Sequence, residues 1–144
     1  MTKSRNPAVE TELTVADVMF EAVTVVERPA HLAAAAYLMQ NLHTPALIVI
    51  DNDSRKPVAL ITGRDIVRAV AHGINAADET VAAWETPDPL SVRPQTTVTE
   101  AVDLMLDSGY PQLPVVDDAH TLVGMIDLYH YARAVRDAQR HRNR

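Results

Sequence analysis

The sequence predicts an α/β fold of the mixed α+β kind, in which two βαββα repeats pack as a pseudo-two-fold pair. Three observations support this prediction: short apolar runs alternate with stretches of helical periodicity, the chain matches itself at a nearly constant spacing, and 144 residues suffice for two small units that share a core. A sheet that carries helices on one face must cover its other apolar face, and a second copy is the obvious cover.

The elements of the first repeat follow from hydrophobic periodicity and from the residues that end helices and strands. We expect a short helix at 15–19, a strand at 22–26, a helix at 32–42, strands at 46–50 and 57–61 around a polar turn, and a helix at 63–72. The first long helix stops before Pro45, and Gly73 is a natural C-terminal stop for the last one.

The same order of elements returns in the second half of the chain. Pro45 aligns with Pro111 at a spacing of 66 residues, and after a one-residue shortening in the polar turn Ile61 aligns with Ile126 at 65. Apolar, proline and aspartate matches hold this register over some fifty positions, which argues for duplication. We therefore divide the chain into a flexible tail at 1–12, a first repeat at 13–75, a second repeat at 76–136 and a basic C-terminal tail at 137–144.

Composition and charge exclude several classes of function. The chain carries 13 Lys and Arg residues against 19 Asp and Glu residues, and its net charge of -6 is the wrong sign for a protein that follows nucleic-acid phosphates. The absence of cysteine excludes thiolate catalysis and disulfide scaffolds. No apolar run has the length needed to span a membrane, and residues 46–50, for example, are a run of only five. We therefore expect a cytoplasmic protein that binds neither nucleic acid nor membrane.

Patterns typical of metal or catalytic centres are also missing. Six histidines occur without a spacing that would place two of them on one helix face beside a carboxylate, so we expect no metal site. No serine or lysine has a recognisable nucleophile setting, and the acidic pairs Asp51/Asp53 and Asp117/Asp118 lie in turns. The sequence thus predicts a protein that is not an enzyme.

The most informative stretch is Leu60-Ile61-Thr62-Gly63-Arg64-Asp65, where an apolar strand runs into a helix. One interpretation is structural: Thr62 caps the helix, and Asp65 suits the positive end of the helix dipole. The other is functional, because the same corner gathers a hydroxyl, a guanidinium, a carboxylate and backbone amides, which together suit a ribose phosphate. Taken alone, the local pattern favours the cap interpretation.

Several segments together resemble a tandem pair of cystathionine β-synthase (CBS) domains, also called a Bateman module. They are Asp17-Val18-Met19, the stretch at 60–65, Leu113-Pro114-Val115-Val116-Asp117 and Leu122-Val123-Gly124-Met125-Ile126, and they span residues 13–136. The resemblance implies a βαββα fold in each repeat, two clefts between the repeats, and frequent dimerisation of such modules. It also implies adenosine-containing ligands such as AMP, ADP, ATP, S-adenosylmethionine or NAD(H).

The resemblance assigns ligand-binding roles to residues of both repeats. In the family, a Thr or Ser and an Asp at the strand–helix junction hold the ribose, and segments of the opposite repeat line the adenine. Carried over to this sequence, one cleft would use Thr62, Gly63, Arg64 and Asp65 from the first repeat with Leu90, Tyr110, Pro111 and Gln112 from the second. Tyr110 would stack on the base and Arg64 would meet the phosphate; a half-buried ring and a solvated arginine are the structural alternatives.

The second cleft departs from the family pattern. Asp127 and His130 stand where Thr62 and Asp65 stand in the first repeat, so the hydroxyl is absent and an imidazole replaces the ribose-binding carboxylate. Asp127 also places a negative charge where a phosphate would approach, although it is a good helix cap. This degenerate cleft would be lined by Thr24, Thr44, Pro45, Ala46, Asp127 and His130. We expect one competent cleft at most.

These observations lead to two main hypotheses. The first is a homodimeric regulatory module that senses an adenosine-containing nucleotide in one cleft and signals to a separate effector protein. The rival is a ligand-free dimeric scaffold for interactions or stress, which the altered second cleft makes credible. An enzyme that acts on nucleotides is a weaker third hypothesis. We also expect Trp84 to seal an interface and the C-terminal arginines to be solvated.

Overall fold

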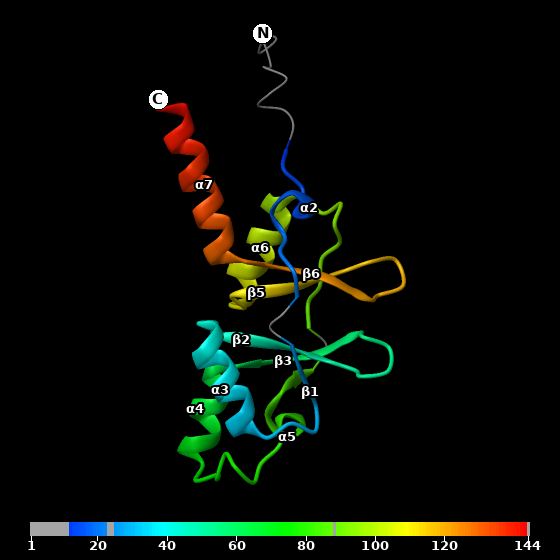
Figure 1. Ribbon diagram of the computed structural model, residues 1–144, viewed down its shortest axis with the longest axis vertical. Coiled ribbons are helices and arrows are strands. Elements are labelled where there is room, and N and C mark those ends of the chain that lie inside the picture. Colours follow the sequence, from blue (N-terminus) through cyan, green and yellow to red (C-terminus); the bar gives the residue numbers. More distant parts are fainter. Residues whose placement is uncertain (1–11, 23–24, 88, 144) are drawn as a thin grey trace.

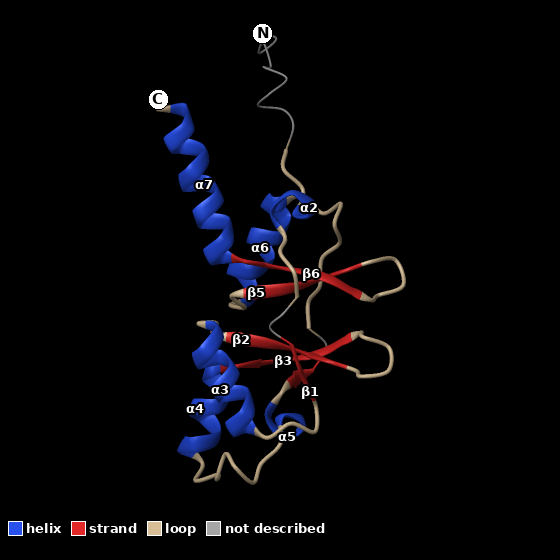
Figure 2. Ribbon diagram, in the orientation of Figure 1, coloured by secondary structure: helices blue, strands red, loops and turns tan. Residues whose placement is uncertain are grey.

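The computed structural model of the protein describes residues 12–22, 25–87 and 89–143. Two halves of similar build lie end to end along the longest axis, and a β-hairpin from each half faces the other at the centre (Figure 1). The long helices lie on one side of these hairpins, and the hairpin turns point to the opposite side (Figure 2). This arrangement confirms the predicted mixed α/β fold with two packed repeats.

The first repeat contains the helices and strands that its sequence predicts. Its elements are β1 (Val25–Glu27), α3 (Leu32–Leu42), β2 (Ala46–Ile50), β3 (Pro57–Thr62) and α4 (Gly63–Ala71). β1 pairs in parallel with β2, β2 pairs antiparallel with β3, and β3 pairs antiparallel with the short strand β4 (Thr86–Pro87). His43 adopts the left-handed conformation and ends α3 two residues before Pro45.

The second repeat follows the same order with a reduced first strand. Its elements are α6 (Val98–Ser108), β5 (Gln112–Val116), β6 (Leu122–Asp127) and α7 (Leu128–Arg142), and β5 pairs antiparallel with β6. The counterpart of β1 is a single parallel bridge between Val92 and Val115. Pro94 follows closely and has no amide hydrogen to donate to a longer ladder. α7 extends through Arg142, so most of the expected basic tail continues this helix.

Each repeat donates its leading segment to the other repeat. The short helix α2 (Val15–Val18) begins the first repeat in sequence, yet Val15 is buried in the core of the second repeat. The corresponding helix α5 (Val81–Trp84) packs against the first repeat, where Val81 is buried. The two repeats are therefore interlocked, and each core is completed by a segment of the other.

The backbone hydrogen bonds of these exchanged segments obey the same 66-residue spacing as the sequence. The Val15 amide donates to the Thr96 carbonyl at 2.7 Å, and the Val81 amide donates to the Ala30 carbonyl at 2.8 Å. The residues that follow are exchanged as well, because β4 pairs with β3 and the segment after α2 bridges to β6. These matching contacts give the molecule its pseudo-two-fold symmetry.

Three apolar clusters fill the space between the elements. On β2, Leu47 and Val49 belong to the cluster under the helices of the first repeat, whereas Ile48 and Ile50 belong to the cluster between the two hairpins. This alternation is the two-residue period of a strand that is covered on both faces, and it explains why β2 is buried along its whole length. A third cluster fills the second repeat.

Candidate functional site

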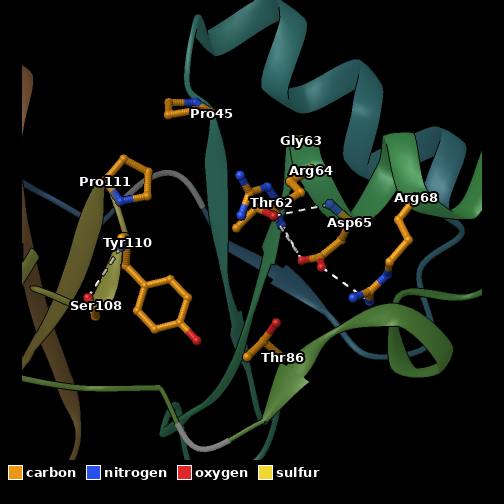
Figure 3. A pocket seen from close by; sticks show the side chains of 11 residues that line it. Pro45, Thr62, Gly63, Arg64, Asp65, Arg68, Thr86, Ser108, Tyr110 and Pro111 are labelled. Carbon is orange, nitrogen blue, oxygen red and sulfur yellow. Dashed lines mark hydrogen bonds and ion pairs between the residues drawn. The ribbon is translucent and has the colours of Figure 1, made fainter. Parts of the chain in front are cut away.

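The first cleft lies where the N-terminus of α4 faces the loop between α6 and β5 (Figure 3). Its volume is about 590 Å³, which is within the range of small-molecule sites. Six of the predicted residues line it: Thr62, Gly63, Arg64, Asp65, Tyr110 and Pro111. Five further lining residues are Pro45, Arg68, Thr86, Ser108 and Gly109. Side chains from both repeats therefore meet around one cavity.

Thr62 and Asp65 form a capping box at the start of α4. The Thr62 hydroxyl accepts from the Asp65 amide at 3.2 Å. In return, Oδ2 of Asp65 accepts from the Thr62 amide at 2.9 Å and from the Thr62 hydroxyl at 3.0 Å. The Gly63 amide donates to the Pro45 carbonyl at 2.9 Å. The capping box, together with this bond to Pro45, thus holds the strand–helix corner, as the cap interpretation expects.

The Asp65 carboxylate is the buried charge of the first cleft. The residue is only 5% exposed, and while Oδ2 is held by the capping box, Oδ1 lies 3.4 Å from Nη2 of Arg68. Arg64 and Arg68 both line the cleft with it. A buried carboxylate is costly unless it is paired and hydrogen-bonded, and Asp65 has both kinds of partner. Among the described lining residues, the cleft offers one carboxylate that can accept from hydroxyl groups and two arginines that can face an anion.

The opposite wall of the first cleft comes from the second repeat. Figure 3 shows the Tyr110 ring across the cleft from Thr62, with Pro111 beside it. Tyr110 is half-buried against the apolar clusters of the second repeat and of the hairpin interface, and its amide donates to the Ser108 hydroxyl at 3.3 Å. The Tyr110 ring is therefore half-buried, as the structural interpretation expects. It also lines the cleft, as a ring that stacks on a base must.

The second cleft is related to the first by the internal repeat. Its volume is about 720 Å³, and four of its predicted residues line it: Thr44, Pro45, Asp127 and His130. Five further lining residues are Phe20, Leu42, His43, Gln112 and Tyr129. The His130 ring stacks on Phe20 with centroids 4.0 Å apart, and its Nδ1 lies 2.8 Å from the Asp127 carboxylate. No arginine or lysine lines this cleft among the described residues.

Gln112 and Ala46 do not take their predicted places at a cleft surface. The resemblance places Gln112 in the first cleft, but the structure places it, buried, in the wall of the second. Its Nε2 donates to the Ala46 carbonyl at 2.8 Å, and its Oε1 accepts from the Thr44 hydroxyl at 3.1 Å. A buried amide needs such partners. Ala46 itself is fully buried in β2 and is absent from the described lining of the second cleft.

Two further predicted residues also need correction or fall outside the description. Leu90 is not among the described residues that line the first cleft. The short strand β4 contributes Thr86 to the lining instead. The reason is the register of β4, which sets Thr86 opposite Leu60, two residues before Thr62. Thr24, which was expected in the second cleft, lies outside the described residues.

Sequence reasoning missed several residues that line the first cleft, and for some of them the sequence contains a signal. Arg68 follows Asp65 at a spacing of three residues, which places both side chains on the same face of a helix. Ser108 and Gly109 precede Tyr110 as the corresponding residues of the second cleft precede Thr44, so the 66-residue spacing identifies them. Thr86 required the register of the exchanged strand, for which the sequence has no local signal.

The part of the chain that the structure describes contains neither a cluster of metal ligands nor a helix that could span a membrane. Within it, no three histidine, aspartate or glutamate side chains gather as the ligands of a metal ion would. No described helix is long and apolar enough to cross a membrane. α7, for example, has 15 residues, and none of them is buried.

Comparison with known proteins identifies the repeats. The CBS domain family matches two segments of the chain, residues 15–72 and 81–137. An uncharacterized 17.7 kDa protein of Acidianus ambivalens is 36% identical over 115 residues, which are 80% of this chain and 68% of that protein. An uncharacterized protein of Methanopyrus kandleri is 38% identical over 95 residues, or 65% of this chain. The chain spans 47% of that longer relative.

A solved structure shows the same fold. The CBS-pair protein CBSX2 of Arabidopsis thaliana is 25% identical, and the match covers 90% of this chain and 99% of that chain with a TM-score of 0.77. The structure of CBSX2 in complex with AMP matches with a TM-score of 0.74 and covers 88% of this chain and 98% of that chain. The two family matches coincide with the two interlocked repeats. The chain therefore belongs to the CBS domain family, as a tandem pair of such domains.

Proposed function

We propose that this chain is a regulatory module whose first cleft binds an adenosine-containing nucleotide, and that its role is binding without catalysis. The observation that carries the proposal is the buried Asp65 carboxylate beside Arg64 and Arg68 in a cavity between the repeats. The similarity to CBSX2, solved in complex with AMP, supports an adenosine ligand. AMP, ADP, ATP, S-adenosylmethionine and NAD(H) are the candidates.

Each polar group of the first cleft has a role in this proposal. The Asp65 carboxylate accepts from the vicinal ribose hydroxyls, and Thr62 fixes its position. The Gly63 and Asp65 amides are used within the corner, so among the described residues the Arg64 amide is left to face a phosphate together with the Arg64 guanidinium. Tyr110 stacks on the base, a contact worth about 1–3 kcal/mol in nucleic-acid sites.

The interlocked repeats connect ligand binding to a change of shape. The walls of the first cleft come from both repeats, and Thr86 enters the cleft on β4, which belongs to an exchanged segment. A ligand that prefers one arrangement of the repeats shifts the population towards that arrangement. In this proposal a separate cytoplasmic protein reads the shift, and neither nucleic acid nor membrane takes part.

The proposed assembly is a homodimer that forms through the helical side of the molecule. Most of the large exposed apolar side chains lie on α3, α4, α6 and α7, among them Tyr37, Val67, Leu106 and Val135. Figure 2 shows these helices on one side of the hairpins. Two such faces can cover each other, and a stable interface requires roughly 800 Å² from each partner.

A thermal-denaturation screen with matched variants tests the nucleotide proposal. The protein is heated with AMP, ADP, ATP, S-adenosylmethionine or NADH, and a ligand that binds only the native state raises the melting temperature as its concentration passes Kd. Asp65→Asn should lose this response. Asp17→Asn is the matched control and should keep it, because Asp17 forms the same capping box with Thr14 away from the first cleft.

The outcomes separate the proposal from its rivals. Stabilisation of wild type and Asp17→Asn, but not of Asp65→Asn, supports nucleotide binding in the first cleft. Stabilisation that survives in Asp65→Asn argues for a different binding site. If no compound stabilises the wild type, the ligand-free dimeric scaffold becomes the better hypothesis. In a separate assay, turnover of a labelled nucleotide would favour an enzyme.

A further inference from the structure

Arg68 connects the first cleft to the single tryptophan of the chain, Trp84. Its Nη2 lies 3.4 Å from Oδ1 of Asp65, and its guanidinium carbon lies 5.5 Å from the centroid of the Trp84 ring. Arg68 also lines the cleft, and Figure 3 shows its side chain turned towards the Asp65 carboxylate. One side chain therefore contacts both the buried carboxylate of the cleft and an aromatic ring that is not among the described residues lining it.

Trp84 belongs to the segment that the second repeat donates to the first. It is the last residue of α5, and its ring packs against the core of the first repeat. The next side chain, Glu85, is buried and pairs with Arg28 at 2.7 Å, and Thr86 then enters the cleft. The contact between Arg68 and Trp84 thus lies two residues from the point where the exchanged segment reaches the ligand cavity.

The two oxygens of the Asp65 carboxylate are in different environments. Oδ2 accepts from the Thr62 amide and hydroxyl, so the capping box holds it. Oδ1 faces Arg68, whose side chain is 53% exposed. A ligand hydroxyl that bonds to Oδ1 competes with Arg68, and a ligand phosphate attracts the same guanidinium. Both effects act on the guanidinium that contacts the Trp84 ring.

We propose that Arg68 is a positioning residue that couples occupancy of the first cleft by a phosphorylated nucleotide to Trp84, and hence to the exchanged segment at 81–87. For its ligand this inference rests on the proposed function. The linkage from Asp65 through Arg68 to Trp84 exists in the free protein, and it is tested there separately. Uncharged adenosine has no phosphate to attract the guanidinium, so it perturbs Trp84 less than AMP or ATP does.

The first experiment needs no ligand, because the emission of Trp84 reports its surroundings without interference from a second tryptophan. Asp65→Asn removes the charge that holds Arg68, so the emission maximum of Trp84 and its quenching by acrylamide should differ from those of wild type. In an Arg68→Gln background the same substitution should change neither quantity. Circular dichroism checks that each variant is folded. Identical emission and quenching in wild type and Asp65→Asn would overturn the inference.

The second experiment measures binding and emission in parallel. Binding of ATP, AMP and adenosine is followed by equilibrium dialysis, and the emission of Trp84 should change with the same midpoint as binding. Arg68→Gln should abolish this change while it weakens ATP binding by about fivefold at most, because an exposed ion pair contributes little affinity. Arg133→Gln is the matched control and should behave as wild type, because Arg133 is the counterpart of Arg68 on exposed α7.

The two proposals fail in different ways. ATP binding without a change in Trp84 emission, or a change that persists in Arg68→Gln, overturns the role of Arg68 and leaves the proposed function standing. If dialysis detects no binding of any of the three compounds, the ligand coupling fails for them, and the thermal-denaturation screen with ADP, S-adenosylmethionine and NADH decides separately whether the proposed function stands. The comparison of wild type with Asp65→Asn in the free protein then decides the linkage by itself.

Discussion

Asp65 and His130 occupy the same position, the third residue of the helix that follows the hairpin, in the first and second repeats. The Asp65 carboxylate closes a capping box with Thr62. In the second repeat the His130 amide donates to the cap residue Asp127 at 2.7 Å, and the His130 ring contacts the same carboxylate at 2.8 Å. The carboxylate is at the third helical position in the first repeat and at the cap position in the second. In both repeats a side chain accepts a hydrogen bond from a backbone amide at the start of the helix.

This exchange changes what each cleft can bind. Phe20 stacks on His130 in the second cleft and stands at the position that Thr86 holds in the first. The second cleft has the negatively charged Asp127 at the N-terminus of α7, whereas Arg64 and Arg68 line the first cleft. Two clefts with nearly symmetric backbones therefore have different chemistry.

Restoring the first junction in the second cleft should create a second binding site. The double variant Asp127→Thr/His130→Asp reproduces the pair found at Thr62 and Asp65, so a carboxylate returns to the third helical position. Calorimetry with a nucleotide that binds the wild type should then show two ligands per chain instead of one. Asp127→Thr alone lacks the new carboxylate and should keep a single site. A folded double variant that still binds one ligand would contradict this prediction and mean that the Thr and Asp pair is not sufficient in a cleft that no described arginine or lysine lines.

Removal of the Thr62 hydroxyl should reduce both stability and ligand affinity. Thr62→Ala removes the acceptor for the Asp65 amide, and it should lower the free energy of unfolding by about 1 kcal/mol. The Asp65 carboxylate also loses a donor that positions it, so nucleotide binding should weaken. Urea denaturation and calorimetry measure the two effects.

The matched control for this variant is Thr97→Ala. The Thr97 hydroxyl accepts from the Glu100 amide at 3.2 Å at the start of α6, and Thr97 is not among the described residues that line the first cleft. Its removal should lower the free energy of unfolding by a similar amount and leave the nucleotide affinity unchanged. Equal losses of affinity in both variants would mean that the Thr62 hydroxyl has no specific role in the site.

The elements of the fold that the sequence predicts depend on local patterns of residues. The features that it does not predict depend on long-range contacts. The bounds of β2 and α3 match their predictions because a continuous apolar run and a 3.6-residue period are determined by near neighbours. The exchange of leading segments has no such signal. Val15 and Val81 are equally apolar whichever core they enter, so their sequence does not reveal the repeat that receives them.

The same distinction applies to the first cleft. Thr62 and Asp65 lie on one helical turn, and the resemblance to CBS domains identifies them from a short motif. Gln112 bonds to the carbonyl of a residue 66 positions away, and no local pattern in β5 shows that its side chain turns to the second cleft. Arg68 differs from both, because its spacing from Asp65 is local and would have identified it.

Gly124 lies where the segment after α2 crosses β6 at close range. A Cβ at this position would lie 3.1 Å from the Phe20 carbonyl oxygen and 3.1 Å from Sδ of Met19. The Phe20 backbone is held by its bridge to Met125, so Gly124→Ala should lower the free energy of unfolding by about 1–3 kcal/mol. Val123→Ala, at an exposed neighbour, should change it by about 0.5 kcal/mol at most. Equal free energies of unfolding in urea for the two variants would show that Met19 and Phe20 can shift without loss of stability.

Val67 tests the proposed homodimer. Its side chain on α4 is 68% exposed, and it is not among the described residues that line the first cleft. Val67→Glu should convert the dimer to a monomer in sedimentation velocity, because an unpaired carboxylate between two apolar faces costs several kcal/mol. Val123→Glu places the same charge on β6, away from the helices, and should remain dimeric. A wild type that sediments as a monomer, or a Val67→Glu dimer as stable as the wild type, would contradict a dimer through the helical side.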